Sequence, residues 1–328
     1  MSEKVLVEAV DLVKNFSTEH LFGKNSDQVV HAVSNVNLKI YEGEILSLVG
    51  ESGCGKSTLG RLLIRMIEPT SGSVLFEGTH LETTSQKGMR EFYKKMQIVF
   101  QDPYASLDPR MTIYDIIAEP LVTQKVFRTK QETRAKVLEL MTTVGIRPEY
   151  VNRFPHQFSG GQRQRIGIAR AIALNPKFIV CDEPVSALDV SIQSQILNLL
   201  RDLQQQKGLT YLFISHDLGV VRYISTRVCV MFLGKICEIG KTEEIYNDPL
   251  HPYTKFLIDA VPEADPTTRD EEKHLLTGEI PSPVNPPSGC RFHTRCPFAK
   301  KICEEKEPEL AGSNGRLVAC HFPGIYKK

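Results

Sequence analysis

The segment that most constrains this chain is a glycine-rich loop, Gly50-Glu51-Ser52-Gly53-Cys54-Gly55-Lys56-Ser57-Thr58. It follows an apolar stretch, Ile45–Val49, that predicts a short buried strand, and a helix is predicted to begin at residues 57–59. The glycines let successive backbone N–H groups turn inward, and the dipole of the following helix adds to this anion nest. Lys56 can place its ammonium on the β- and γ-phosphates, and Ser57 can offer its hydroxyl to Mg²⁺. Strand, loop and helix in this order predict binding of a nucleoside triphosphate.

Two acidic residues follow a second apolar segment. Residues 178–181 are apolar throughout, and Asp182 and Glu183 come directly after them. A carboxylate at the carboxyl end of a buried strand points into the crevice where an α/β sheet binds ligands. Behind a phosphate loop, Asp182 is therefore expected to hold Mg²⁺ through its water shell. Glu183 is expected to face the γ-phosphate and to polarise the attacking water.

A second glycine-containing helix start lies upstream of these carboxylates. Ser159, Gly160, Gly161 and Gln162 open a segment, 163–171, that has the character of a helix. Ser159 is a favoured N-cap residue, and the glycines behind it make this helix start a second phosphate-binding site. One ATP does not need two such sites in one subunit. We therefore expect this one to serve the nucleotide of a neighbouring subunit.

Further motifs complete an ordered set: Gln101, which ends an apolar stretch at 96–100, then Ser186-Ala187-Leu188-Asp189 and His216. The whole set resembles the ATP-binding subunits of ABC transporters, and the resemblance runs through most of the chain. Phe158 replaces the leucine that is commonest at the first signature position, and because both side chains are apolar the same function is expected.

The resemblance implies a role for each of these residues. Two subunits face each other head to tail, and the signature of each caps the ATP of the other. Gln101 reaches Mg²⁺ or the attacking water and couples nucleotide state to a helical subdomain, while His216 senses the γ-phosphate. Phe16 stacks on adenine, and Asp189 belongs to the nucleotide site.

The order of apolar patterns predicts the fold. Residues 5–16 and 29–40 alternate as half-buried antiparallel strands do, and a polar surface loop is expected at 17–28. Residues 114–145 have helical periodicity, and from 177 to 233 strands and helices alternate, as in a mostly parallel, helix-covered sheet. Together with the resemblance, this predicts an α/β, ABC-type P-loop NTPase core with an antiparallel β subdomain and an inserted helical subdomain at about 102–160. The ATP-binding domain is expected at 1–261, and a linker with a small Cys-rich C-terminal domain at 262–328.

Composition limits the compartment and the partners. The 328 residues carry a formal charge of +1, so the net charge does not indicate a nucleic-acid partner. No apolar run approaches the roughly 18–20 residues that cross a bilayer, and the N-terminus lacks a signal-peptide core. The chain is expected at the cytoplasmic face of the membrane, held there by partner subunits.

Eight cysteines divide into two groups. Cys54, Cys181, Cys229 and Cys237 lie within motif or strand patterns and are interpreted as small buried residues. Cys290, Cys296, Cys303 and Cys320 cluster near the end of the chain, where a metal site is favoured over disulfides because cytosolic proteins rarely keep disulfides. Their spacings are longer than zinc knuckles usually show, which favours a [4Fe–4S] cluster over zinc. His293 and His321 are alternative ligands for a zinc site.

Three stretches resemble one branch of the family, the oligopeptide and dipeptide importers: Gln101–Met111, Leu250–Thr254 and the C-terminal cysteines. The resemblance implies an ATPase that energises peptide import and forms a heterodimer with a second, homologous ATPase subunit. Two membrane-spanning permease subunits and an extracytoplasmic peptide-binding protein complete the expected assembly. Import of nickel or another small solute of the same branch is one alternative. A soluble, non-transport ABC ATPase acting on ribosomes or DNA is the other.

Overall fold

The computed structural model describes residues 4–17, 28–261 and 278–327. Most of the loop predicted at 17–28 and most of the predicted linker therefore lie outside the described residues. The chain divides into two compact units. One comprises Met1–Val5, Tyr41–Glu44 and His80–Ile214, and the other comprises Leu6–Ile40, Ile45–Thr79 and Ser215–Lys328.

The first unit contains three parallel strands, β6 (Met96–Val99), β7 (Phe178–Asp182) and β8 (Thr210–Ile214). Every residue of β7 and β8 is buried, as expected for a parallel sheet covered on both faces. Val99 lies beside Cys181 in the register, so the carboxyl ends of β6 and β7 meet at one edge. The helix α2 (Gln86–Lys95) precedes β6 in the chain, and α6 (Val190–Lys207) connects β7 to β8. The predicted strands at 96–100, 177–182 and 210–215 are confirmed to within one residue at each end.

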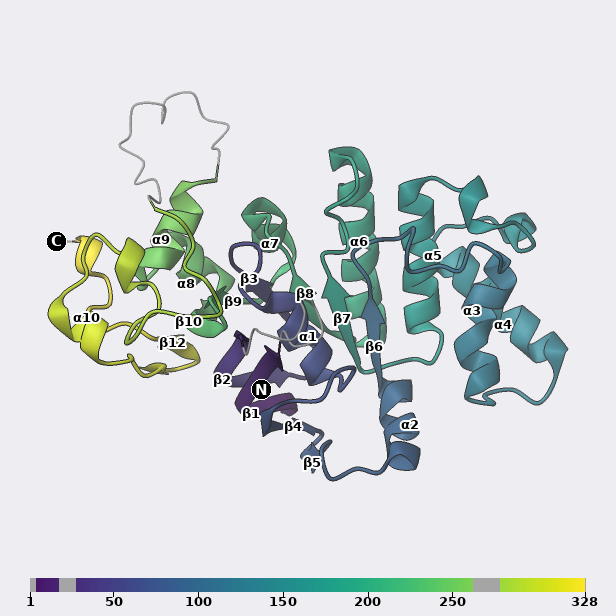
Figure 1. Cartoon of the computed structure of the whole chain (residues 1–328). Coiled ribbons are helices and arrows are strands. Elements are labelled where there is room, and N and C mark those ends of the chain that lie inside the picture. Colours follow the sequence, from purple (N-terminus) through teal and green to yellow (C-terminus); the bar gives the residue numbers. More distant parts are fainter. Residues whose placement is uncertain (1–3, 18–27, 262–277, 328) are drawn as a thin grey trace. The chain divides into compact units, whose positions relative to one another are not determined.

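Between β6 and β7 the first unit is mainly helical (Figure 1). It contains α3 (Ile113–Thr123), α4 (Lys130–Thr143), η1 (Pro148–Tyr150), η2 (Pro155–Gln157) and α5 (Gly160–Ile172), and α3, α4 and α5 pack on one another. The helical pattern predicted over 114–145 is split into two helices. Lys125 takes a left-handed φ of 52° after α3, and Thr129 starts α4 with a capping box to Glu132. Periodicity alone did not reveal this break because apolar residues continue on both sides of it.

The second unit contains a four-stranded sheet in the order β2 (Val29–Tyr41), β1 (Val5–Ser17), β4 (Ser71–Phe76), β5 (Thr79–His80). The strands β1 and β4 are antiparallel, and β1 and β2 match the predicted strands to within one residue. The helix α1 (Lys56–Leu63) follows β3 (Ile45–Val49) directly across the phosphate loop.

A second set of paired strands in this unit joins the end of the chain to the phosphate-loop strand. β3 is parallel to β9 (Arg227–Phe232), β9 is antiparallel to β10 (Lys235–Lys241), and β10 is antiparallel to β12 (Arg316–Val318), which pairs with β11 (Ala311–Ser313). The remaining elements are α7 (Leu218–Ile224), α8 (Thr242–Asn247), α9 (Pro252–Asp259), η4 (His293–Arg295), α10 (Lys301–Glu305) and η5 (Ile325–Lys327). The end of the chain was predicted to be irregular, and its strands were missed because three residues are too few to show a period of two.

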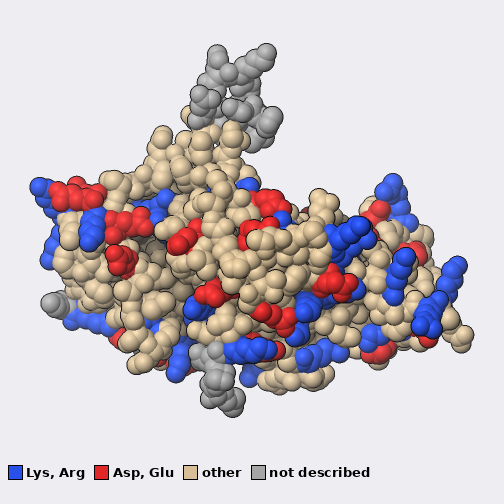
Figure 2. Space-filling view, turned by 90° about the horizontal axis from the view of Figure 1, so that it is seen from below, with Lys and Arg blue, Asp and Glu red and all other residues tan. Residues whose placement is uncertain are grey.

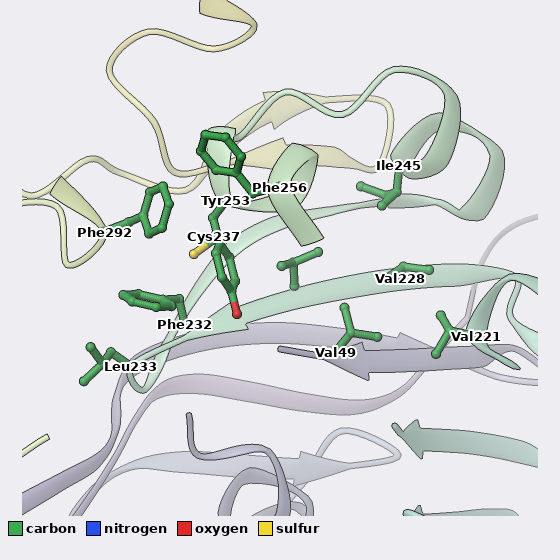
Figure 3. Close-up of a cluster of buried hydrophobic side chains, with 11 residues drawn as sticks. Val49, Val221, Val228, Phe232, Leu233, Cys237, Ile245, Tyr253, Phe256 and Phe292 are labelled. Atoms are coloured by element: carbon green, nitrogen blue, oxygen red, sulfur yellow. The ribbon is translucent and has the colours of Figure 1, made fainter. Parts of the chain in front are cut away.

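A buried cluster holds the C-terminal segment against this sheet (Figure 3). Phe292 comes from the segment between the first two C-terminal cysteines and lies on Phe232 of β9 and Tyr253 of α9, with ring centroids 5.4 and 5.2 Å apart. Aromatic pairs at these separations add to the free energy gained by burial. Residues 278–327 therefore share a hydrophobic core with the strand that carries the phosphate loop.

Candidate active site

The backbone of the phosphate loop requires glycine at two positions. Gly50 has φ 153° and a Cβ there would lie 2.1 Å from the carbonyl oxygen of Met231. Gly55, with φ 105°, caps α1, and a Cβ there would lie 2.2 Å from the carbonyl oxygen of Ala32. Gly55, the N-cap of α1, has no side chain that could cap the helix, and a helix N-terminus of this kind attracts an anion.

Lys56 folds back over the loop from the first position of α1. Its buried ammonium donates to the carbonyl oxygens of Gly50 at 2.8 Å and Glu51 at 3.0 Å. Burial raises the pKa of the neighbouring Cys54 thiol, although Lys56 opposes the shift, so Cys54 is a packing residue rather than a nucleophile. The loop thus brings together one ammonium and a helix N-terminus, and its contact with phosphate stays a prediction.

We expect Gly55→Ala to destabilise the protein by about 3 kcal/mol and to abolish nucleotide binding, because the new methyl group meets backbone rather than a movable side chain. Gly53→Ala is the matched control. Gly53 also has a positive φ, 77°, but nothing lies within 4 Å of an added Cβ, so about 1 kcal/mol of backbone strain is expected. Urea denaturation of both variants measures the difference, and equal losses would show that the contact with Ala32 is unimportant.

The predicted catalytic carboxylate and glutamine lie together in the first unit. Asp182 ends β7 and is 2% exposed, and Glu183 follows it with a left-handed φ of 46°. The amide Nε2 of Gln101, just beyond β6, donates to Oε2 of Glu183 at 2.9 Å. A positive φ at a non-glycine residue costs free energy, so the fold holds Glu183 in a strained backbone conformation. In this conformation its carboxylate contacts Gln101. The parallel pairing of β6 and β7 is what brings the two residues together.

The second predicted phosphate site begins at a capped helix. Ser159 is the N-cap of α5: its hydroxyl accepts from the N–H of Gln162 at 3.4 Å, and the amide oxygen of Gln162 accepts from the N–H of Ser159 at 3.1 Å. A Cβ on Gly161 would lie 2.3 Å from Cγ2 of Ile192, so glycine permits close approach of α5 to the start of α6. Phe158, at the substituted signature position, is 5% exposed and packs inward.

Asp189 is the N-cap residue of α6. Its carboxylate caps the helix, accepting from the N–H of Ile192 at 3.0 Å and from the hydroxyl of Ser191 at 2.8 Å. These bonds lower the pKa of Asp189, with the Ile192 N–H the largest cause. Participation of Asp189 in the nucleotide site stays a prediction.

The stretch after Gln101 is tied to the signature helix α5. The guanidinium of Arg163 lies 3.8 Å from the ring centroid of Tyr104, and Arg170 donates to the carbonyl oxygen of Ser106 at 2.8 Å. Tyr104 is itself 62% exposed. A displacement of this exposed stretch would therefore be transmitted to α5.

Two predicted nucleotide contacts belong to the same unit as the phosphate loop. His216 is exposed at the start of the segment that leads into α7. Phe16, near the end of β1, is 40% exposed, and the ammonium of Lys14 lies 5.0 Å from its ring centroid. Their contacts with nucleotide stay predictions.

The four C-terminal cysteines line one cavity, together with His251, Phe292, His293, Phe298, His321 and Phe322. Burial is the main cause that raises the pKa of Cys290, Cys296 and Cys320 to about 11 each. As the side chains stand, no group of three or more His, Cys, Asp or Glu residues in the described ranges is arranged to hold a metal ion. The cysteines predicted to be small buried residues are all buried.

Sequence reasoning missed two residues that contact the phosphate loop. The hydroxyl of Tyr253 accepts from the N–H of Glu51 at 2.9 Å, and Arg295 forms an ion pair with the Glu51 carboxylate. The only available signal was that Tyr253 lies in the Leu250–Thr254 stretch, which was recognised without a role. Arg295, beside Cys296, carried no signal.

Comparison with known proteins decides the family. The model of the ABC transporter family matches residues 33–186, and that of the oligopeptide/dipeptide transporter C-terminal region matches residues 237–303. The chain is 51% identical over 322 residues to the oligopeptide transport ATP-binding protein OppF of Escherichia coli, covering 97% of this chain and 96% of OppF. It is 50% identical over 328 residues to AppF of Bacillus subtilis, covering 98% of each. The chain belongs to the family of oligopeptide transport ATP-binding proteins.

Solved structures agree with the fold of this ATPase. The dimeric, post-hydrolysis ATP-binding cassette MJ0796 bound to ADP and Pi has 30% identity and a TM-score of 0.65, covering 72% of this chain and 99% of that one. CbiO1 of Clostridium perfringens, part of the cbiONQ transporter complex, has 28% identity and a TM-score of 0.65, covering 75% and 92%. The predicted resemblance and the α/β ABC ATPase fold are thereby confirmed, and the protein is an ATPase of the ABC transporter class.

Proposed function

We propose that this chain hydrolyses ATP to energise import of oligopeptides or dipeptides. The observation that carries the proposal is similarity over nearly the whole chain, including the C-terminal region, to proteins named for oligopeptide transport. The ATP motifs alone would not distinguish peptide import, because other cassettes share them. The geometry of the phosphate loop and of the Gln101–Glu183 pair supports the ATPase part.

Each residue then has a chemical role. Lys56 binds the β- and γ-phosphates, and Phe16 stacks on adenine. Ser57, Gln101 and Asp182 hold Mg²⁺, directly or through its water shell. Glu183 acts as general base on the attacking water, and His216 contacts the γ-phosphate.

A second ATPase subunit completes the cycle. Ser159, Gly160, Gly161 and Gln162 contact the ATP of that subunit, with Asp189 at the same interface, and two ATPs close the pair. Hydrolysis opens it and moves the helical part, which the Tyr104–Arg163 contact ties to the exposed stretch after Gln101. That stretch contacts the membrane-spanning part of the transporter, which consists of two permease subunits. A peptide-binding protein outside the membrane delivers peptide to these permeases.

Association with permeases places the chain at the cytoplasmic face of the membrane. Within the described residues no helix combines the length and the apolar character needed to cross a bilayer. On the face drawn in Figure 2, basic and acidic side chains are interspersed, whereas a rival ATPase acting on ribosomes or DNA would be expected to display a basic patch.

The test is transport by a reconstituted complex. The chain is purified with the subunits that accompany it, placed in liposomes and assayed for ATP hydrolysis with binding protein and ligand. Stimulation by peptides and not by Ni²⁺ is expected. Stimulation by Ni²⁺ alone would support the small-solute alternative, and recovery with ribosomes instead of membrane proteins would support the non-transport one.

We further propose that the C-terminal cysteines form a small domain around one metal centre, a [4Fe–4S] cluster, with zinc as the alternative. The lining of the cavity fits a sulfur-ligated centre, because it combines the four cysteine sulfurs with three phenylalanine rings. His293 and His321 also line it, but a ring nitrogen of each lies within hydrogen-bonding distance of a backbone carbonyl, at 2.9 and 2.8 Å. When bound, such a centre cross-links a segment that has few apolar residues of its own.

Anaerobically purified protein is expected to be brown and to contain iron and sulfide in cluster ratio. Cys320→Ser should bleach it and make residues 288–323 more sensitive to protease. Cys229→Ala is the matched control, since Cys229 is buried in β9 and does not line the cavity, and it should keep its iron. Stoichiometric zinc without iron would favour the zinc alternative, and metal-free protein with paired disulfides would contradict both.

A further inference from the structure

An arginine from the C-terminal segment reaches the phosphate loop. Nη1 of Arg295 lies 2.6 Å from Oε2 of Glu51, and the two side chains are 5% and 21% exposed. Both residues belong to the second compact unit. The pair is therefore a nearly buried link between the cysteine-lined segment and the loop expected to bind ATP.

Glu51 is held at its N–H, its carbonyl oxygen and its side chain. Its N–H donates to the hydroxyl of Tyr253 at 2.9 Å, and its carbonyl oxygen accepts from Nζ of Lys56 at 3.0 Å and from the N–H of Cys54 at 3.3 Å. Arg295 holds the carboxylate. Because Glu51 is the second residue of the loop, these contacts fix the direction of the peptide groups that follow it.

The fold places Arg295 with little freedom. It ends η4, where its N–H donates to the carbonyl oxygen of Phe292 at 3.0 Å, and its guanidinium lies 5.9 Å from the ring centroid of Phe232. Phe292 is 1% exposed and packs on Phe232 and Tyr253 (Figure 3). The same aromatic cluster thus positions Tyr253 and Arg295, the two residues from outside the loop that hold Glu51.

The charge on Glu51 explains why an arginine is useful there. A carboxylate on a loop that binds a triphosphate repels the ligand, and the repulsion is strong where water is scarce. Arg295 neutralises that carboxylate. Its own burial is unfavourable, since its Nε is buried without a hydrogen-bond partner among the described residues, and a buried ion pair is weak support for stability. The pair is better explained by nucleotide binding than by folding.

We propose that Arg295 is a positioning residue for nucleotide binding, which neutralises Glu51 and holds the phosphate loop in its binding conformation. The proposal rests on the proposed function only in that the loop binds ATP. It gives the C-terminal segment a role in the affinity of this subunit for its own nucleotide.

The test measures binding of MgADP and of the magnesium complex of a non-hydrolysable ATP analogue to the full-length chain by calorimetry. Arg295→Met is expected to weaken binding of the ATP analogue about tenfold, which is within the usual range of coupling between sites. Binding of ADP should be weakened less, because ADP carries less charge. Arg295→Lys should recover part of the loss, since the positive charge returns without the bidentate geometry. Adding Glu51→Gln to Arg295→Met should recover most of it, because the unpaired carboxylate is gone.

Arg316→Met is the matched control for loosening of the C-terminal segment. Arg316 lies in β12, is 20% exposed and pairs with Asp248 and Glu238 rather than with the loop. It should bind both nucleotides as the wild type does. Equal weakening by Arg316→Met and Arg295→Met, or no recovery with Glu51→Gln, would overturn the proposal. A wild-type chain that binds no nucleotide would instead overturn the proposed function.

Discussion

Glu183→Gln is expected to lower ATP turnover in the assembled transporter by about 10²–10⁴-fold while leaving ATP binding intact, because general-base assistance has that magnitude. The glutamine keeps the shape of the side chain and an oxygen that can accept from Nε2 of Gln101, now 2.9 Å from Oε2 of Glu183. It loses the basicity needed to polarise water. ATP should therefore remain trapped in a closed pair of subunits, which retention of labelled ATP after rapid gel filtration measures.

Glu149→Gln is the control for this change. Glu149 is an exposed glutamate of η1 in the same compact unit, and its substitution should leave turnover at the wild-type rate. Near-wild-type hydrolysis by Glu183→Gln would remove Glu183 from the catalytic role. Loss of ATP binding by the same variant would show that Glu183 contributes to binding of ATP rather than to the hydrolysis step.

Ser159→Arg is expected to abolish hydrolysis in the complex while this subunit still binds ATP at its own phosphate loop. The long, charged side chain would occupy the start of α5, which we propose contacts the ATP of the second subunit. Lys56→Ala should have the opposite defect, because Lys56 lies on this subunit's own loop. Photolabelling of each subunit with an ATP analogue separates the two outcomes.

We expect that loss of the N-cap of α5 alone would not abolish hydrolysis, and Ser85→Arg is the control that tests this. Ser85 caps α2 in the same unit, with its hydroxyl accepting from the N–H of Gly88, so Ser85→Arg removes a cap of the same kind. It should cost about 1 kcal/mol in stability and leave hydrolysis unchanged. If Ser159→Arg instead removes ATP affinity from its own subunit, the head-to-tail arrangement is wrong.

The sequence by itself determined the local parts of the site. The strand before the phosphate loop, the helix after it and the N-cap at Ser159 follow from patterns a few residues long. The structure has them where they were predicted, to within one residue at the start of the helix, which is Lys56. The apolar run before Asp182 likewise predicted a buried strand with a carboxylate at its end. Such features are readable because neighbouring residues alone set backbone conformation, capping and burial period.

The tertiary structure decided the contacts between distant residues. Gln101 and Glu183 are 82 residues apart and meet only because β6 and β7 pair in parallel. Tyr253 and Arg295 lie 202 and 244 residues from Glu51, and no pattern near any of them indicates the contact. Their positions depend on an aromatic cluster and on short strands that add the end of the chain to the sheet. Packing of this kind is set by the shape of the whole core, so only the folded chain reveals that the C-terminal segment reaches the phosphate loop.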